Sequence, residues 1–209
     1  MENRVTTPSK GMFNVKQISS TNVLVKVSIL SVMAYVIMLI EIPVMFFPGF
    51  LKIDLSDLPA LIGGLALGPI AGIMVQLVKN ILHFITKTDT GGVGELANFL
   101  LGIALIIPPS ILYMKYKTKK SAMTGIIIGI IVMAITGALF NYYILLPFYA
   151  KMMPLEQIIA WSASANAAIV DMKTLILYAI VPFNILKGIV VAIFTSILYK
   201  RISPILKLK

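Results

Sequence analysis

A few polar side chains within long apolar stretches are the residues of this chain best suited to chemistry. Asn141 interrupts one stretch, and Asn184 and Lys187 stand three residues apart in another, just beyond Pro182. Carboxamides both donate and accept hydrogen bonds, and an ammonium group donates three. Ionisable groups inside a bilayer cost at least about 2.5 kcal/mol each, so they usually face a cavity or a partner. These residues therefore favour recognition of a small polar ligand between apolar walls.

A glycine-rich run at residues 88–98 leads into another apolar stretch and adds two more polar groups. Glu95 and Asn98 are three residues apart, so they point to one side of a helix that begins near this run. A Gly-x-Gly-x-x-Ala spacing in the run formally matches a dinucleotide fingerprint, but that motif requires a preceding strand. An apolar stretch precedes it instead, so we exclude nucleotide binding. Capping of the helix start is the structural alternative for the two side chains.

A polar stripe follows one face of the apolar segment that precedes this run. Two roles are open for it: hydrogen bonding between helices, which we favour, and lining of a cargo cavity. The stripe comprises Gln76, Asn80, His83 and Lys87, with Lys79 beside it.

The residue types and motifs that the sequence lacks exclude several classes of chemistry. Without cysteine it forms no disulfide, thiolate metal site or cysteine nucleophile, and one histidine excludes histidine-rich metal sites. No Gly-x4-Gly-Lys-Ser/Thr motif occurs, so the chain does not hydrolyse ATP through a P-loop. The sequence also shows no acid–histidine–serine arrangement of the kind that would indicate a hydrolase. The pattern indicates a binding pocket without a motor of its own.

The composition places the chain in a lipid bilayer. Of its 209 residues, 59% are hydrophobic and 12% are charged, and the mean hydropathy is +0.97. A soluble domain is roughly 45–50% apolar and about 25% charged, because its surface must stay wet. This chain has too few charges to cover a soluble globule of its size.

Six apolar segments provide the predicted membrane-spanning helices. They cover residues 23–47, 56–67, 69–85, 93–114, 121–147 and 173–199. The second is short for a crossing and ends at Gly68-Pro69, so we expect a tilted or broken helix there. Segment 148–172 is expected to include an interfacial helix. The prediction is an all-α membrane protein, with a six-transmembrane-helix bundle over residues 23–209 and a flexible cytoplasmic tail at residues 1–22.

The positive charges are unevenly distributed between the two sides of this bundle. Most of the 18 lysines and arginines fall in the N-terminal tail, the loop at 115–120 and the C-terminus. Cytoplasmic loops of membrane proteins carry an excess of lysine and arginine, so both termini are predicted to be cytoplasmic. The net charge of +10 thus follows from topology, and no binding to nucleic acid is expected.

Small residues recur at four-residue intervals in three of the predicted spans. Such repeats let helix backbones approach closely within a membrane, so they predict tight helix packing. The repeats are Gly64-x3-Gly68-x3-Gly72, Gly125-x3-Gly129 and Ala134-x3-Ala138.

Several runs of residues are distinctive when taken together. They are Phe50-Leu51-Lys52-Ile53-Asp54-Leu55-Ser56-Asp57-Leu58-Pro59-Ala60, Lys79-Asn80-x-x-His83, Gly91-Gly92-Val93-Gly94-Glu95-Leu96-Ala97-Asn98-Phe99, Phe140-Asn141-Tyr142-Tyr143 and Asn184-x-x-Lys187. Over roughly residues 24–200 the chain thereby resembles the riboflavin-specific S component of energy-coupling-factor (ECF) transporters. The first run and the Gly-Gly-Val-Gly-Glu-Leu-Ala-Asn run are the most specific to the riboflavin member.

The resemblance implies a multi-pass subunit of a bacterial plasma membrane that captures riboflavin at the outer face and delivers it to the cytoplasm. It implies that the partners are a transmembrane coupling subunit and two cytoplasmic ATPases. Riboflavin is then cargo rather than a cofactor, and the chain itself is not an enzyme. The ligand-binding residues implied by position are Leu51, Gly94, Glu95, Ala97, Asn98, Asn141, Asn184 and Lys187.

The chemistry of riboflavin suits these side chains. Its ring has a polar edge of N–H and C=O groups, which the carboxamides of Asn141 and Asn184 match. Glu95 and Lys187 are able to accept from and donate to the ribityl hydroxyls. We also hypothesise that Glu95 and Lys187 pair, which would leave a nearly neutral pocket for an uncharged ligand.

Three other functions stay open at this point. The chain could be an S component for another vitamin or a flavin analogue. It could instead be an autonomous channel or secondary transporter, or a membrane enzyme, although it shows no convincing catalytic constellation.

Overall fold

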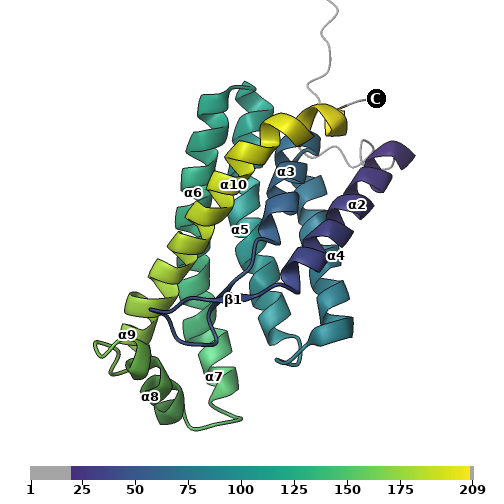
Figure 1. Ribbon diagram of the computed structural model, residues 1–209. Helices are drawn as coiled ribbons and strands as arrows, with labels where there is room; N and C mark the ends of the chain where they lie inside the picture. Colours follow the sequence, from purple (N-terminus) through teal and green to yellow (C-terminus); the bar gives the residue numbers. More distant parts are fainter. Residues whose placement is uncertain (1–19, 208–209) are drawn as a thin grey trace, which may run out of the picture.

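The computed structural model describes residues 20–207, with side chains to residue 202, and shows a helical bundle with a short two-stranded ribbon (Figure 1). Most of the predicted tail, residues 1–19, lies outside the described residues, whereas Thr21 and Asn22 already belong to the first described helix. The elements in chain order are α2 (Thr21–Met38), β1 (Ile42–Pro43), β2 (Lys52–Ile53), α3 (Asp57–Leu67), α4 (Pro69–Lys87), α5 (Val93–Tyr116), α6 (Lys119–Phe140), η1 (Asn141–Leu145), α7 (Leu146–Tyr149), α8 (Leu155–Ala165), α9 (Met172–Leu175), η2 (Ile176–Ile180) and α10 (Val181–Lys207).

Five helical runs of the described chain are long and apolar enough to cross a membrane. They are Thr21–Met38, Pro69–Lys87, Val93–Tyr116, Lys119–Tyr149 and Met172–Ile202. Helix α3 has 11 residues and spans about 16 Å, roughly half of the hydrocarbon layer, so the expected short helix is confirmed. The sixth crossing and the cytoplasmic placement of both termini stay predictions.

The first predicted span is wrong at its C-terminal end. Helix α2 stops at Met38 rather than near residue 47, and β1 pairs antiparallel with β2, with Ile42 opposite Ile53. Pro43 and Pro48 account for the difference, because proline lacks an N–H and disfavours helical backbone in the residue before it. The apolar residues 39–47 therefore belong to a loop, which we call the α2–α3 loop (residues 39–56).

The core lies where α2, α3, α4, α5 and α10 meet. Ala34, Leu61, Val75, Leu105 and Val191 each come from a different one of these helices, and all are almost completely buried. By contrast, most of the large apolar side chains on the outside of α2 and α6 are exposed, as expected for a surface that lipid covers. The described chain is thus packed inside and apolar outside.

Helices α5 and α6 pack closely through the predicted small-residue repeat. A Cβ atom added at Gly125 would overlap the backbone of Pro109, and one added at Gly129 would overlap the carbonyl of Leu105. Pro109 has no N–H to bond the carbonyl of Leu105, four residues earlier. The glycines let α6 approach the part of α5 that its prolines leave without helical hydrogen bonds, so the predicted close packing is confirmed.

Two π-helical turns shape the helices that carry the predicted ligand-binding asparagines. Turn η1 precedes Pro147 and turn η2 precedes Pro182, and each turn contains the residue four positions before its proline, Tyr143 or Tyr178. Since proline cannot donate a hydrogen bond to the carbonyl of that residue, the helix widens into a π-turn there instead of keeping the regular hydrogen-bond pattern of an α-helix. Each proline thus disturbs its helix through a wider turn just before it.

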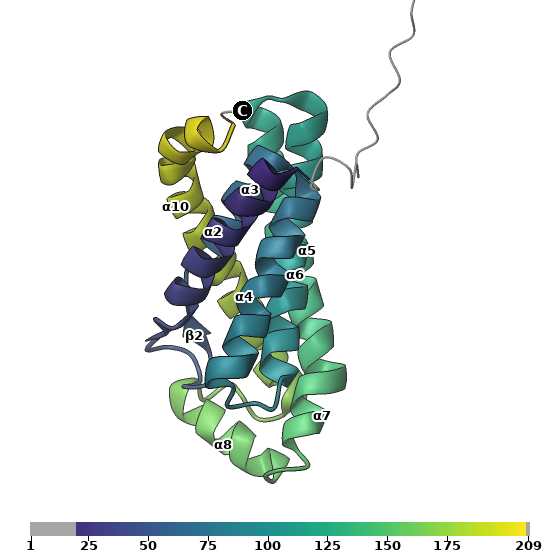
Figure 2. The ribbon, with the colours of Figure 1, turned by 90° about the vertical axis from the view of Figure 1, so that its right-hand side faces the viewer.

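Helix α8 lies across the end of the bundle next to α7 (Figure 2). It confirms the helix expected within residues 148–172, whereas its position at the membrane interface stays a prediction. Its buried Ile158 belongs to a small apolar cluster against which Phe47 and Leu51 of the α2–α3 loop also pack. The cluster therefore supports the loop.

Gly129→Val is expected to destabilise the bundle by about 1–3 kcal/mol, because the new side chain would push α6 away from the carbonyl of Leu105. Thermal unfolding in detergent would measure this as a lowered midpoint. Gly49→Val is the control, since nothing lies within 4 Å of a Cβ at Gly49. Equal midpoints for the two variants would contradict the close packing of α5 and α6.

Candidate ligand-binding site

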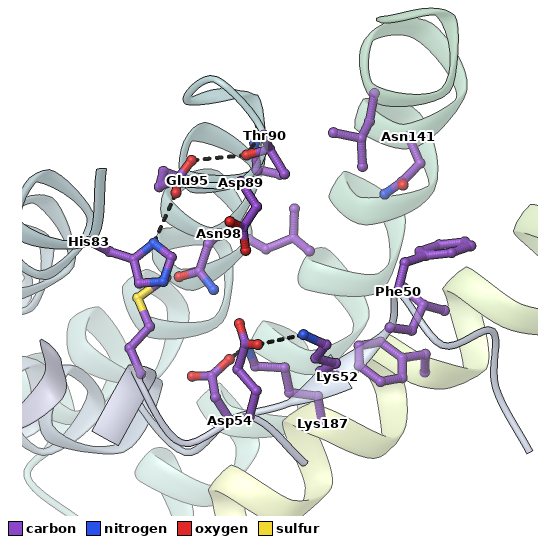
Figure 3. Close-up of a pocket in the computed structure, with 18 of the residues that line it drawn as sticks. Phe50, Lys52, Asp54, His83, Asp89, Thr90, Glu95, Asn98, Asn141 and Lys187 are labelled. Atoms are coloured by element: carbon purple, nitrogen blue, oxygen red, sulfur yellow. Dashed lines mark hydrogen bonds and ion pairs between the residues drawn. The ribbon is translucent and has the colours of Figure 1, made fainter. Parts of the chain in front are cut away.

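A cavity of about 370 Å³ opens where α4 ends and α5 begins (Figure 3). Small-molecule sites usually occupy roughly 300–1,000 Å³, so this volume suits a small organic ligand. Its walls come from the end of α2 and the α2–α3 loop, from the end of α4, the α4–α5 turn and the start of α5, from η1 and α7, and from α10. The cavity contains all eight predicted ligand-binding residues: Leu51, Gly94, Glu95, Ala97, Asn98, Asn141, Asn184 and Lys187. Their contact with a ligand stays a prediction.

Lys187 does not pair with Glu95 as hypothesised. Its Nζ lies 2.9 Å from Oδ2 of Asp54 and 3.2 Å from Oδ2 of Asp57. Asp54 lies near the end of the α2–α3 loop, and Asp57 is the first residue of α3. In the sequence these acids stand out only as members of the distinctive run Phe50–Ala60. Their pairing with Lys187, more than a hundred residues away, has no local signal in the sequence.

The two aspartates and two lysines form one buried cluster, which we call the ion cluster (Asp54, Asp57, Lys79 and Lys187). Nζ of Lys79 lies 2.7 Å from Oδ1 of Asp57 and donates to Oγ of Ser56 over 2.6 Å. Lys79 is completely buried. Two positive and two negative charges balance, so the cluster has no net charge to solvate. It joins the α2–α3 loop and the start of α3 to α4 and α10.

Glu95 instead holds the α4–α5 turn together. Its Oε1 lies 2.9 Å from Nδ1 of His83, and its Oε2 accepts from the hydroxyls of Thr88 over 3.2 Å and Thr90 over 3.1 Å. The turn also needs Gly92, whose φ of +93° favours glycine. The favoured role of the polar stripe, hydrogen bonding between helices, is confirmed for His83.

Two buried polar atoms beside the cavity have no hydrogen-bond partner within the described structure: Nε2 of His83 and Oδ1 of Asn98. Figure 3 shows both side chains on the wall that carries Glu95. A neutral imidazole whose Nδ1–H donates to a carboxylate has an acceptor at Nε2. Buried polar atoms are nearly always paired, so this wall presents acceptors suited to the O–H or N–H groups of a ligand.

The two asparagines on the opposite wall are fixed by their own helices. Nδ2 of Asn141 donates to the carbonyl of Gly137, and Nδ2 of Asn184 donates to that of Ile180, each over 2.8 Å. Gly137 also makes room for Asn184, whose Nδ2 would lie 2.7 Å from a Cβ at that position. Figure 3 shows Asn141 across the cavity from His83. The carboxamides are thereby held in place before any ligand arrives.

Comparisons with known proteins agree with this architecture. A family model described as ECF transporter, substrate-specific component, matches residues 22–199. The chain belongs to this family. A solved structure of the S component of a bacterial ECF transporter superimposes with a TM-score of 0.71 at 37% sequence identity, covering 88% of this chain and 97% of the other.

Curated relatives of this S component carry the name riboflavin transporter. RibU of Staphylococcus aureus is 39% identical over 184 residues, which cover 88% of this chain and 92% of the relative. FmnP of Bacillus subtilis is 37% identical over 183 residues, which cover 87% and 92% of the two chains. The S component is a membrane protein, as its apolar helices indicate.

Sequence reasoning missed several residues that line the cavity of this S component. They include Phe50, Lys52, Asp54, Asp89, Tyr149 and Phe183, whereas His83 and Lys87 fulfil the second role left open for the polar stripe, lining of a cavity. Phe183 packs edge-on against Phe47 with ring centroids 5.4 Å apart, which adds an apolar contact between α10 and the α2–α3 loop. The signal available for Asp54 was the need of Lys187 for an acidic partner inside the bundle.

Opposite charges pair around the cavity of the S component. Lys52 pairs with Glu41 at 2.7 Å at the mouth and Lys187 pairs with Asp54, whereas the carboxylate of Glu95 is hydrogen-bonded by the His83 ring and by two threonine hydroxyls. Among the described residues, no group of three His, Asp or Glu side chains could hold a metal ion. The cavity is therefore suited to an uncharged polar ligand.

Asp57→Asn is expected to lower the free energy of unfolding by about 3 kcal/mol, because it leaves two buried lysines with a single acid. Glu41→Gln breaks the partly exposed pair with Lys52 and is expected to cost less than about 1 kcal/mol. Unfolding of the ligand-free protein by denaturing detergent would measure both. A similar decrease in the free energy of unfolding for the two variants would contradict the claim that the ion cluster stabilises the fold.

Proposed function

We propose that this S component is the riboflavin-binding subunit of an ECF importer, capturing riboflavin at the outer face of the membrane. The observation that carries the proposal is the convergence of eight residues, predicted from a riboflavin-specific pattern, on the walls of one cavity. The names of the two relatives described above support the same ligand.

The chemistry of the cavity supports an uncharged flavin. Riboflavin has no net charge at neutral pH, and the paired charges of the cavity favour a neutral guest. The carboxamides of Asn141 and Asn184 offer both donors and acceptors, which suits the N–H and C=O groups of the flavin ring edge. The acceptors on the opposite wall, Nε2 of His83 and Oδ1 of Asn98, suit the hydroxyls of the ribityl chain. Apolar neighbours such as Leu101 and Phe183 would enclose the ring.

The proposed import requires energy from partner subunits. The sequence has no P-loop, so ATP hydrolysis belongs to other chains. Membership of the family supports a transmembrane coupling subunit and two cytoplasmic ATPases as those partners. In this proposal riboflavin is carried through the protein as substrate, with no chemical change.

Titration of riboflavin into the purified protein, followed by quenching of flavin fluorescence, tests the site. Asn184→Ala and Lys187→Ala are each expected to weaken binding at least about tenfold, roughly 1.4 kcal/mol, since each removes a hydrogen-bonding group from the cavity wall. Lys173→Ala is the control, because Lys173 is exposed and lies outside the cavity. Affinities within twofold of the wild type for both cavity variants would place the site elsewhere, and a wild type that binds another vitamin but no riboflavin would overturn the proposal.

A further inference from the structure

A second cavity, of about 260 Å³, lies at the other end of the bundle between α5, α6 and α10. Helix α5 runs from one cavity to the other, because Gly94 and Glu95 near its start line the first and Tyr113 near its end lines the second. The region lies at the top of Figure 1, where α5 turns into α6. The proposed riboflavin site makes no use of it.

Three lysines line this second cavity, and no acidic residue lies on the described parts of α5 beyond Glu95, of α6 or of α10. The three lysines are Lys117, Lys119 and Lys200. The sequence has no Asp or Glu between Glu95 and Glu156, nor anywhere after Asp171, so the helices that form the cavity lack counter-charges at this end. Lys117 lies over the ring of Tyr113, with Nζ 5.8 Å from the ring centroid, which holds one of the charges near the cavity. An uncompensated cluster of this kind attracts an anion.

Thr195 supplies an independent sign of a ligand. Its side chain lines the same cavity, and only 1% of its surface is exposed. Its Oγ has no hydrogen-bond partner within the described residues, whereas Ser196 next to it donates to the carbonyl of Ala192 over 2.8 Å. Buried hydroxyls are nearly always hydrogen-bonded, so this hydroxyl is available to a group that enters the cavity.

The remaining wall of the cavity is apolar. Leu65, Ala122, Met123 and Ile126 line it, and Met123 is 41% exposed on the lipid-facing side of α6. A free inorganic anion would gain nothing from these side chains, whereas an amphiphile would bury hydrocarbon against them. Basic pockets between transmembrane helices on the cytoplasmic side suit anionic lipid headgroups.

We propose that this cavity binds one anionic phospholipid. The headgroup phosphate lies among Lys117, Lys119 and Lys200 and accepts a hydrogen bond from Oγ of Thr195. One acyl chain leaves the cavity along Ala122, Met123 and Ile126 towards the surrounding bilayer. The lipid would tie α5, α6 and α10 together at the end where positive charge gathers.

Native mass spectrometry of the purified protein, with phosphatidylglycerol or phosphatidylcholine added, tests the proposal. We expect one retained phosphatidylglycerol and at least about tenfold weaker retention for the double variant Lys117→Gln/Lys200→Gln, since each lysine near an anionic headgroup contributes. The matched control is Lys115→Gln/Lys120→Gln, which removes the same charge nearby from residues that do not line the cavity. It is expected to change retention less than twofold. Equal losses for both pairs, or equal retention of phosphatidylcholine, would overturn the proposal.

Two further measurements complete the test. One distinguishes a bound lipid from a free anion, and the other distinguishes loss of the binding site from loss of stability. Thr195→Val keeps the side-chain volume, so the thermal midpoint in neutral detergent should not fall, whereas the midpoint gain caused by phosphatidylglycerol should shrink at least about threefold. Inorganic phosphate at millimolar concentration should neither raise the midpoint nor displace the lipid. Stabilisation by inorganic phosphate equal to that by phosphatidylglycerol, or an unchanged lipid effect in the valine variant, would contradict the lipid assignment.

Discussion

The buried ion cluster is the interaction on which the rest of the structure depends. Buried charges are tolerated only when they are paired and hydrogen-bonded, and here two aspartates face two lysines within 3.2 Å. The aspartates belong to the α2–α3 loop and the start of α3, whereas the lysines belong to α4 and α10. Satisfying these four charges therefore fixes the loop over the bundle, and the loop in turn forms one wall of the cavity.

The helix irregularities place the remaining walls. Pro147 and Pro182 each lie just beyond a π-turn, and Asn141 and Asn184 stand beside those turns with their amides bonded to backbone carbonyls. The lack of a side chain at Gly137 leaves room for the carboxamide of Asn184 inside the bundle. A preformed cavity of this kind reduces the ordering cost that a ligand must overcome on binding.

The apolar helices and the cavity residues could be predicted from the sequence because both depend on local pattern. Hydrophobic runs revealed the helices, and the runs that resemble a known family singled out eight residues that share one cavity. Contacts between distant segments could not be predicted. Nothing local shows that Lys187 meets Asp54 rather than Glu95, since that choice depends on how the α2–α3 loop folds back. The prediction that the first helix continues past Met38 was also wrong, because Pro43 and Pro48 outweigh the apolar pattern of residues 39–47.

The central claim is that Asp54 and Lys187 are energetically coupled within a neutral cluster. A double-mutant cycle of Asp54→Asn and Lys187→Gln, measured as the free energy of unfolding of the ligand-free protein, tests this most directly. Each single variant leaves one uncompensated buried charge, whereas the double variant restores the balance between Asp57 and Lys79. The double loss should be smaller than the sum of the single losses by at least about 1.5 kcal/mol. Losses that add within about 0.5 kcal/mol would contradict the account.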